Sequence, residues 1–186
     1  MISTNSNTLG RWVIIIGLLV LAGSAGNVFG QDVATGQALA NVLTALSVTA
    51  IQPLDFQSVF QGVAKIQDQT NDALSGIFGI AGQGSAGISV YLTLPQYIAL
   101  ATGVDRMTIA FRITDATVDT MNFTPSTVTA ADGWVDVDPN SLPNTLVVGQ
   151  GGQTNIYLGG RVVPSVDQTA GAYAGDIICN VAYTGV

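Results

Sequence analysis

The sequence predicts an all-β protein whose strands pair in an antiparallel sandwich or barrel. Thr, Val, Ile, Gly and Asn are frequent, Glu is absent and Lys occurs once, so the residues that usually fill exposed helix faces are missing. Strand-like segments recur with turn residues between them, as in sandwiches and barrels. Two of these segments alternate apolar and polar residues, which is typical of strands with one buried face.

The first thirty residues predict a secretory signal peptide. A polar start with one cation, Arg11, precedes an apolar run at residues 12–22 that is too short to span a bilayer. Small residues follow, and Val28 and Gly30 suit cleavage before Gln31. We expect export from a Gram-negative bacterium and no membrane association after cleavage. The alternative is an uncleaved signal anchor, although no stop-transfer flank follows the apolar run.

The remainder, residues 31–186, is long enough for one domain with its own core. It keeps four of the five cations and all twelve aspartates, which gives a formal charge of −8. We therefore expect neither a nucleic-acid partner nor an anionic membrane. The single cysteine excludes a disulfide within the chain, so stability must come from packing or from partners.

The clearest strands are predicted at residues 87–94 and 107–114. In each, every second side chain is apolar, so one face should be buried. Pro95 should end the first of them. The residues predicted to point inward are Ile88, Val90, Leu92 and Leu94 in the first strand, and Met107, Ile109, Phe111 and Ile113 in the second.

The C-terminal stretch alternates in the same way and places the lone cysteine in an apolar row. This row indicates that Cys179 is a buried apolar residue. A reactive or intermolecular thiol is the alternative. The predicted core face of this last strand consists of Tyr173, Ile177, Cys179, Val181 and Tyr183.

Weaker signals predict further strands, and the short connections between them favour antiparallel pairing, because helical crossovers would need more residues. For residues 95–102, a short turn of helix and an irregular segment are both open. The weaker strands are predicted at residues 46–51, 54–60, 63–67, 74–80, 118–123, 134–137, 145–148 and 154–163.

The residue types disfavour enzymatic chemistry. The chain has no histidine, which removes the commonest general base and metal ligand together with Ser-His and Cys-His nucleophile pairs. Every aspartate adjoins turn residues or lies on an outward strand phase, so we interpret the aspartates as solvated surface groups. The glycine-rich segments lack the Gly-Lys-Ser/Thr ending of a phosphate loop. We expect no enzyme and no cofactor.

One acidic segment, residues 132–140, is a weak candidate for a calcium site. Asp132, Asp136 and Asp138 offer the hard oxygen ligands that calcium prefers. Their spacing is not that of an EF-hand loop. A hydrated β-turn is the favoured interpretation, and the calcium site is the alternative.

Several short motifs follow one another in a characteristic order. They are Leu-Ser-Val-Thr at residues 46–49, Pro-Leu-Asp-Phe at 53–56, Ile-Ser-Val-Tyr-Leu-Thr-Leu-Pro at 88–95, Tyr-Leu-Gly-Gly at 157–160, Gly-Ala-Tyr-Ala-Gly at 171–175 and Val-Ala-Tyr at 181–183. This order resembles that of the bacterial domain of unknown function 4402 family (DUF4402). Gln57 departs from the pattern, since a glycine is expected after the Asp-Phe pair.

The ending is also similar to that of spore-coat-U-type pilins, which are assembled by a chaperone and an usher. In those proteins a Gly-x-Tyr start opens a final strand that closes on an aromatic residue. The resemblance implies an incomplete immunoglobulin-like sandwich, whose groove is filled by the N-terminal strand of the next subunit. The implied partners are further copies of the chain, a periplasmic chaperone and an outer-membrane usher.

Residues 31–43 form an N-terminal extension before the sandwich domain at residues 44–186. The extension has no obvious turns, so it is a candidate donor strand. An ordinary first strand or a frayed terminus is the alternative. The side chains that would line a groove are Val33, Leu39 and Leu43 on one phase, or Ala38, Ala40, Val42 and Leu46 on the other.

Of three candidate functions, an Asp-dependent enzyme with two carboxylates converging in a cleft has no supporting motif in the chain. Two functions therefore remain in competition. The first is a structural subunit of an extracellular filament or surface layer that assembles by N-terminal donor-strand exchange. The second is a monomeric secreted adhesive module that binds a glycan or a protein through exposed aromatic residues. The aromatic residues expected on its surface are Tyr91, Tyr97, Trp134 and Tyr157.

Overall fold

The computed structural model describes residues 34–185 of the chain. The chain divides into two compact units, Met1–Asn41 and Val42–Val186. In the first unit, residues 34–41 are exposed and belong to no strand or helix. The predicted signal peptide, its cleavage site and Val33 lie outside the described residues.

The second unit is an antiparallel β-sandwich, which confirms the predicted fold class. Among the described residues, the only helical element is the short 3-10 helix η1 (Pro125–Thr127). All strand pairs are antiparallel. The strands are β1 (Ser47–Gln52), β2 (Lys65–Gln67), β3 (Gly76–Ala81), β4 (Ile88–Thr93), β5 (Tyr97–Leu100), β6 (Arg106–Ala110), β7 (Ala116–Asp119), β8 (Gly133–Val137), β9 (Gln153–Leu158), β10 (Gly160–Val163), β11 (Tyr173–Ala174) and β12 (Ile178–Tyr183).

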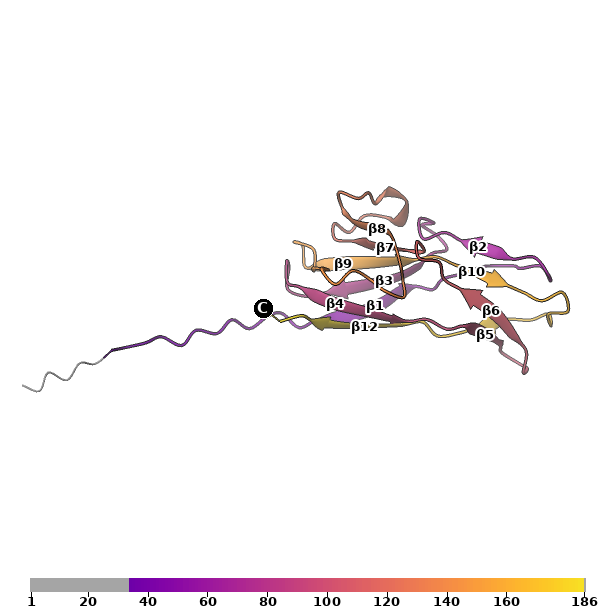
Figure 1. The fold of residues 1–186 in the computed structure, drawn as a ribbon, viewed down its shortest axis with the longest axis horizontal. Coiled ribbons are helices and arrows are strands. Elements are labelled where there is room, and N and C mark those ends of the chain that lie inside the picture. Colours follow the sequence, from indigo (N-terminus) through magenta and orange to yellow (C-terminus); the bar gives the residue numbers. More distant parts are fainter. Residues whose placement is uncertain (1–33, 186) are drawn as a thin grey trace, which may run out of the picture. The chain divides into compact units, whose positions relative to one another are not determined.

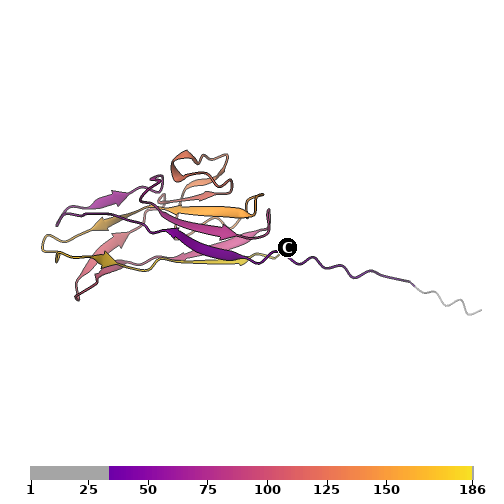
Figure 2. The same ribbon diagram turned by 180° about the vertical axis from the view of Figure 1, so that it is seen from behind.

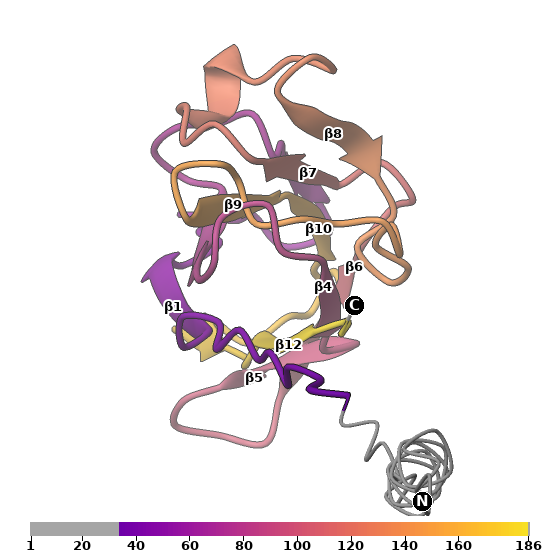
Figure 3. The same cartoon turned by 90° about the vertical axis from the view of Figure 1, so that its left-hand side faces the viewer.

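The strands form two five-stranded sheets and one two-stranded ladder. The first sheet has the order β1-β3-β9-β7-β8, the second has the order β11-β5-β6-β10-β2, and β12 pairs with β4 alone. The chain passes from β4 into β5 across Pro95 and from β11 into β12 across residues 175–177, so the ladder extends from one edge of the second sheet (Figure 1). In the end-on view, β7 and β9 lie across from β12 (Figure 3).

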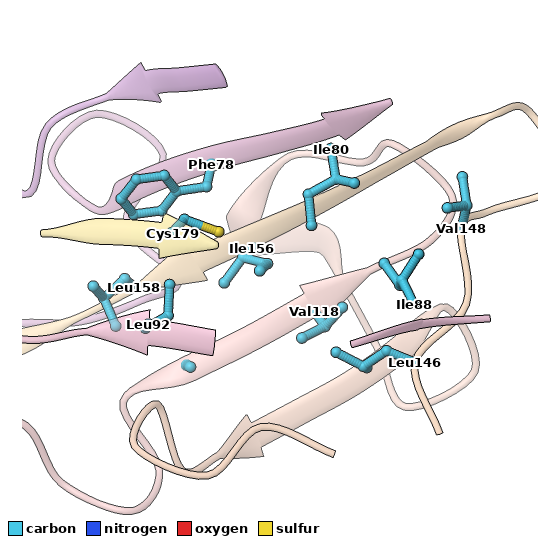
Figure 4. Packing of buried hydrophobic residues seen from close by; sticks show 11 residues of the cluster. Phe78, Ile80, Ile88, Leu92, Val118, Leu146, Val148, Ile156, Leu158 and Cys179 are labelled. Atoms are coloured by element: carbon cyan, nitrogen blue, oxygen red, sulfur yellow. The ribbon is translucent and has the colours of Figure 1, made fainter. Parts of the chain in front are cut away.

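The main core fills the space between the first sheet and the β4–β12 ladder (Figure 4). Ile88 and Leu92 of β4 are buried and Tyr91 between them is exposed, as the alternation predicts. Each large aliphatic side chain buried in this way stabilises the fold by roughly 1.5–3 kcal/mol. The buried members are Phe78, Ile80, Ile88, Leu92, Ala116, Val118, Leu146, Val148, Ile156, Leu158 and Cys179.

A smaller core lies on the inner face of the second sheet. Its buried members are Met107, Ile109 and Val162. Phe56 and Val59 pack against it from the segment between β1 and β2, and both are only partly buried. The β4–β12 ladder covers the inner face of the first sheet. This part of the second sheet is instead covered by the irregular segment that contains Phe56 and Val59.

Two predicted strands are absent. Residues 54–60 form no strand, because Gln57 adopts a positive φ of 52° and its N–H donates to Oδ1 of Asp55 at 2.6 Å. Such local bonding turns the chain instead of extending it. Residues 145–148 make only one isolated bridge, between Val147 and Gly87.

Other predicted boundaries also change. Residues 95–102 contain β5, which pairs with β6 on one side and β11 on the other, so pairing on both sides outweighs any helical preference. β6 ends at Ala110, because the N–H of Arg112 donates to Asp115 at 2.7 Å and begins a turn. Ile113, predicted to point inward, is consequently 72% exposed.

Two aspartates contradict the prediction that all are solvated, since Asp115 and Asp119 are fully buried. Asp115 pairs with Arg112 at 2.8 Å. Asp119 accepts the N–H groups of Met121 at 2.7 Å and Phe123 at 2.6 Å. Local donors replace water around both carboxylates, which makes their burial tolerable.

Candidate functional site

Two strand edges without partners lie next to each other in the sandwich. β1 is hydrogen-bonded only to β3, and β12 only to β4. The two strands run side by side (Figures 1 and 2), yet within residues 34–185 no backbone ladder joins them. A free edge of this kind presents unpaired N–H and C=O groups along the strand.

Tyr183 closes one end of the space between these edges. Its hydroxyl donates to the carbonyl of Thr44 at 2.8 Å and accepts the N–H of Gln83 at 2.6 Å. Because Tyr183 ends β12 and Thr44 lies just before β1, the two strands run in opposite directions. The hydroxyl of Tyr183 therefore links the C-terminal end of β12 to the residues just before β1.

A cleft of about 970 Å³ lies between the segment that follows β1 and the segment that precedes β12. One wall is the segment 53–61, which follows β1, and the other is the segment 168–177, which contains β11. The floor is the apolar inner face of the second sheet, with Ile98, Met107, Ile109 and Val162. This volume is at the upper end of the range for binding sites of small ligands.

The far end of the cleft is bridged by polar contacts. The side-chain amide of Gln61 donates to the carbonyl of Gln168 at 2.6 Å, and the N–H of Gly62 donates to the carbonyl of Ser165 at 2.9 Å. The bridge at Gln61 and Gly62 therefore closes one end of the cleft.

Asp105 fixes the wall that carries β11. Its Oδ2 accepts the N–H of Thr169 at 2.8 Å, the hydroxyl of Tyr173 at 2.9 Å and the side-chain amide of Gln168 at 2.9 Å. These hydrogen bonds, chiefly that from the Thr169 backbone, lower the pKa of Asp105 to about 2. The carboxylate therefore stays ionised at neutral pH and holds residues 168–173 in place.

Some apolar side chains of β1 and β12 remain exposed. Val48 and Ile51 of β1 are 37% and 59% exposed, and Ile178 of β12 is 52% exposed. Val48 lies opposite the core residue Ile80, so an additional strand beside β1 would cover it, whereas Ile51 lies over Gly79 on the other face of the first sheet.

The predicted core face of the last strand spans both cores. Ile177, Cys179, Val181 and Tyr183 pack in the main core, whereas Tyr173 packs in the smaller one. Burial raises the pKa of the Cys179 thiol to about 11. The structure brings Tyr173 and Ile177 together on the cleft wall.

The described candidate donor residues up to residue 43 are exposed, whereas Leu46 is half-buried and packs against the main core. Leu39 is 89%, Val42 91% and Leu43 38% exposed. Residues 34–43 form no strand, and none of them is charged.

The three candidate calcium ligands each make separate local contacts. Asp132 accepts the N–H and hydroxyl of Thr129, Asp136 accepts the side-chain amide of Gln69, and Asp138 accepts the N–H of Asn140. Within the described part of the chain, no group of three or more His, Cys, Asp or Glu side chains is placed to hold a metal ion.

The predicted surface aromatics divide into two groups. Tyr91 and Tyr97 are 60% and 51% exposed, and Trp134 is half-buried. Tyr157 contradicts the prediction, because it is fully buried and its hydroxyl donates to the carbonyl of Phe123 at 2.5 Å. Burial raises its pKa to about 12.

Sequence reasoning identified one wall of the cleft and missed the other. The wall at residues 53–61 was predicted as a strand, although Pro53 and the Asp55–Gln57 turn signal an interruption. The role of Asp105 depends on residues more than sixty positions away, so no local pattern indicates it.

No family model, no curated protein and no solved structure matches this chain. The resemblance to DUF4402 and to pilins therefore stays a prediction from the sequence motifs. Residues 34–185 contain no helix long and apolar enough to cross a membrane.

Proposed function

We propose that this chain is a structural subunit of an extracellular bacterial filament, a fimbrium, or of a surface layer, and that it assembles by donor-strand exchange. In this proposal the N-terminal extension of one copy fills the cleft of the next. The observation that carries the proposal is the apolar cleft of about 970 Å³ between segments that continue two free strand edges.

The cleft offers both kinds of contact that an added strand needs. The free edge of β11 and β12 supplies backbone hydrogen-bonding groups, and the inner face of the second sheet supplies apolar contacts. Main-chain bonding gives such an addition its affinity, and alternate side chains give it specificity. The sandwich is thus an incomplete immunoglobulin-like domain that a strand from outside completes.

The extension has the properties of the missing strand. Residues 34–43 carry no charge and are exposed, with Leu39 and Val42 almost fully so. An uncharged segment enters an apolar cleft without the cost of burying an unpaired charge. In extended form these residues would reach roughly 33 Å.

Export and assembly partners complete the proposal. The signal-like residues 1–30 support secretion, and an incomplete sandwich needs its edge protected before assembly. A periplasmic chaperone would serve that purpose, and an outer-membrane usher would order the exchange.

The alternative is a monomeric adhesive module, which Tyr91 and Tyr97 favour because both are more than half exposed. The other two aromatic candidates weaken it, since Tyr157 is buried and Trp134 half-buried. Two separate tyrosines offer a smaller stacking surface than the four that the sequence predicted.

Deleting residues 31–43 tests the proposal. Filaments should disappear, and the remaining domain should aggregate or depend on a chaperone, because its edges and apolar cleft stay open. Fusing the same residues to the C-terminus through a short Gly/Ser linker should restore a soluble monomer with a higher melting temperature. Thermal unfolding and sedimentation of both forms, with a linker-only fusion as control, measure this.

A different outcome favours the adhesive module. If the truncated chain is a stable monomer and the fusion melts no higher than the linker-only control, the cleft needs no donor strand and the assembly proposal is wrong.

A further inference from the structure

The outer face of the second sheet is open, whereas the central strands β7 and β9 of the first sheet are buried on both faces. Residues of β7 are buried at every position, and so are those of β9 after Gln153. On β6 and β10, buried and exposed residues alternate. One face of the second sheet is therefore available for contact.

This open face carries arginines and no carboxylate. Arg106 of β6 and Arg161 of β10 are exposed, and neither forms a salt bridge with a described residue. The nearby Arg112 is occupied by Asp115. The exposed residues of the face, which we name the arginine face, are Ile66, Tyr97, Ala99, Arg106, Thr108, Ala110, Arg161, Val163 and Ala174.

Apolar side chains lie between the arginines. In the register of the sheet, Arg161 is flanked by Ile66 and Ala110. Ile66 and Tyr97 are 52% and 51% exposed. Arginine and tyrosine set among apolar contacts are characteristic of protein interfaces.

The charge distribution identifies the kind of partner. Residues 34–185 contain eleven aspartates and four cations, and three of those cations lie on the neighbouring strands β2, β6 and β10. Of the eleven aspartates, all but Asp115 and Asp119 reach the surface, and none of them lies on this face. Copies therefore repel one another except where this face meets aspartates of a neighbour.

We propose that the arginine face is a lateral contact that binds the acidic surface of a second copy of this chain. The contact is distinct from strand exchange. It rests on the proposed function, because a filament would repeat the contact many times and so strengthen it. Five strands span roughly 20 Å, so one contact is small and weak. Subunits arrayed along filaments would multiply it and draw filaments into bundles.

Sedimentation of the full-length protein tests this contact without requiring filaments. The double variant Arg106→Gln with Arg161→Gln removes both free cations. A matched control, Asn144→Asp with Gln150→Glu, changes the net charge by the same amount at exposed positions outside the arginine face. Self-association is measured at 50 mM and 500 mM salt, and bundling is scored by negative-stain microscopy.

Wild type and control should associate at 50 mM salt, and the arginine variant about five- to tenfold more weakly. High salt should weaken wild type to a similar extent. The arginine variant should still form filaments, but separate ones. Loss of filaments from every form would contradict the proposed function alone, since sedimentation still reports the contact.

Three results would overturn the lateral contact. The first is equal association of the arginine variant and wild type, and the second is equal weakening of control and variant, which would assign the effect to net charge. The third is wild type that does not self-associate but binds heparin through its arginines, which would make the partner a polyanion and not a second copy.

Discussion

Cys179 illustrates what alternation along a strand can predict at the level of single residues. The apolar row at the C-terminus predicts a buried thiol, and Cys179 is 9% exposed in the main core. With its pKa raised to about 11 by burial, roughly one thiol in a thousand is ionised at pH 8. Labelling of the native protein by a bulky maleimide should therefore be slow.

Replacing Cys179 with Ser should lower the free energy of unfolding by about 1–2 kcal/mol, because a hydroxyl would lie in an apolar row without an assured partner. Chemical denaturation measures the difference, and Cys179→Ala separates the lost volume from the added polarity. Rapid maleimide labelling of the native thiol would place Cys179 on the surface and contradict this account of the last strand.

Gln57 and the buried aspartates show where residue-level prediction ends. The resemblance to DUF4402 predicts glycine at position 57, and Gln57 adopts a positive φ, a conformation that glycine favours. Asp115 and Asp119 sit beside turns as surface aspartates do. Their burial depends on donors that only the folded loop supplies, so spacing alone could not reveal it.

At the level of elements, strands with alternating apolar and polar side chains were predictable, whereas the irregular cleft wall at residues 53–61 was not. The rows in β4 and β12 follow from alternation. The short β11 and the irregular segment 53–61 have no such period, and their positions depend on distant contacts such as the Gln61–Gln168 bridge. The candidate site thus consists of segments whose structure is hard to predict from local sequence patterns.

Replacing Asp105 with Asn should loosen the β11 wall in a pH-dependent way. The folded pKa of about 2 lies below the usual aspartate value near 4, so the carboxylate adds stability that is present above pH 4 and lost as the pH falls toward 2. The difference in melting temperature between wild type and Asp105→Asn should be greatest at neutral pH and shrink across that interval.

The matched control for this prediction is Asp167→Asn, at an exposed aspartate that accepts a hydrogen bond from the Ser165 hydroxyl. Its difference from wild type measures the effect of an aspartate-to-asparagine change that does not touch the Asp105 contacts. A constant difference between wild type and Asp105→Asn from pH 7 to pH 2 would mean that the carboxylate charge does not hold the wall.

For the whole molecule, composition and strand spacing predicted the antiparallel sandwich, but not that its second sheet lacks an opposing strand ladder. That property arises from the order in which strands pair, and it leaves β1, β11 and β12 with free edges. The central claim is that residues 31–43 of another copy occupy the cleft beside these edges.

Disulfide trapping tests this claim most directly. In a Cys179→Ala background, Ala172→Cys on the cleft wall is combined with Ala38→Cys, Leu39→Cys or Ala40→Cys in the extension, which covers both strand phases. After mild oxidation of assembled protein, at least one pair should give a ladder of dimers, trimers and longer chains on a non-reducing gel, and each single-cysteine parent should give at most dimers. Only internally bridged monomers would show that the extension fills its own cleft, and no bridge with any pair would contradict occupation of the cleft by the extension.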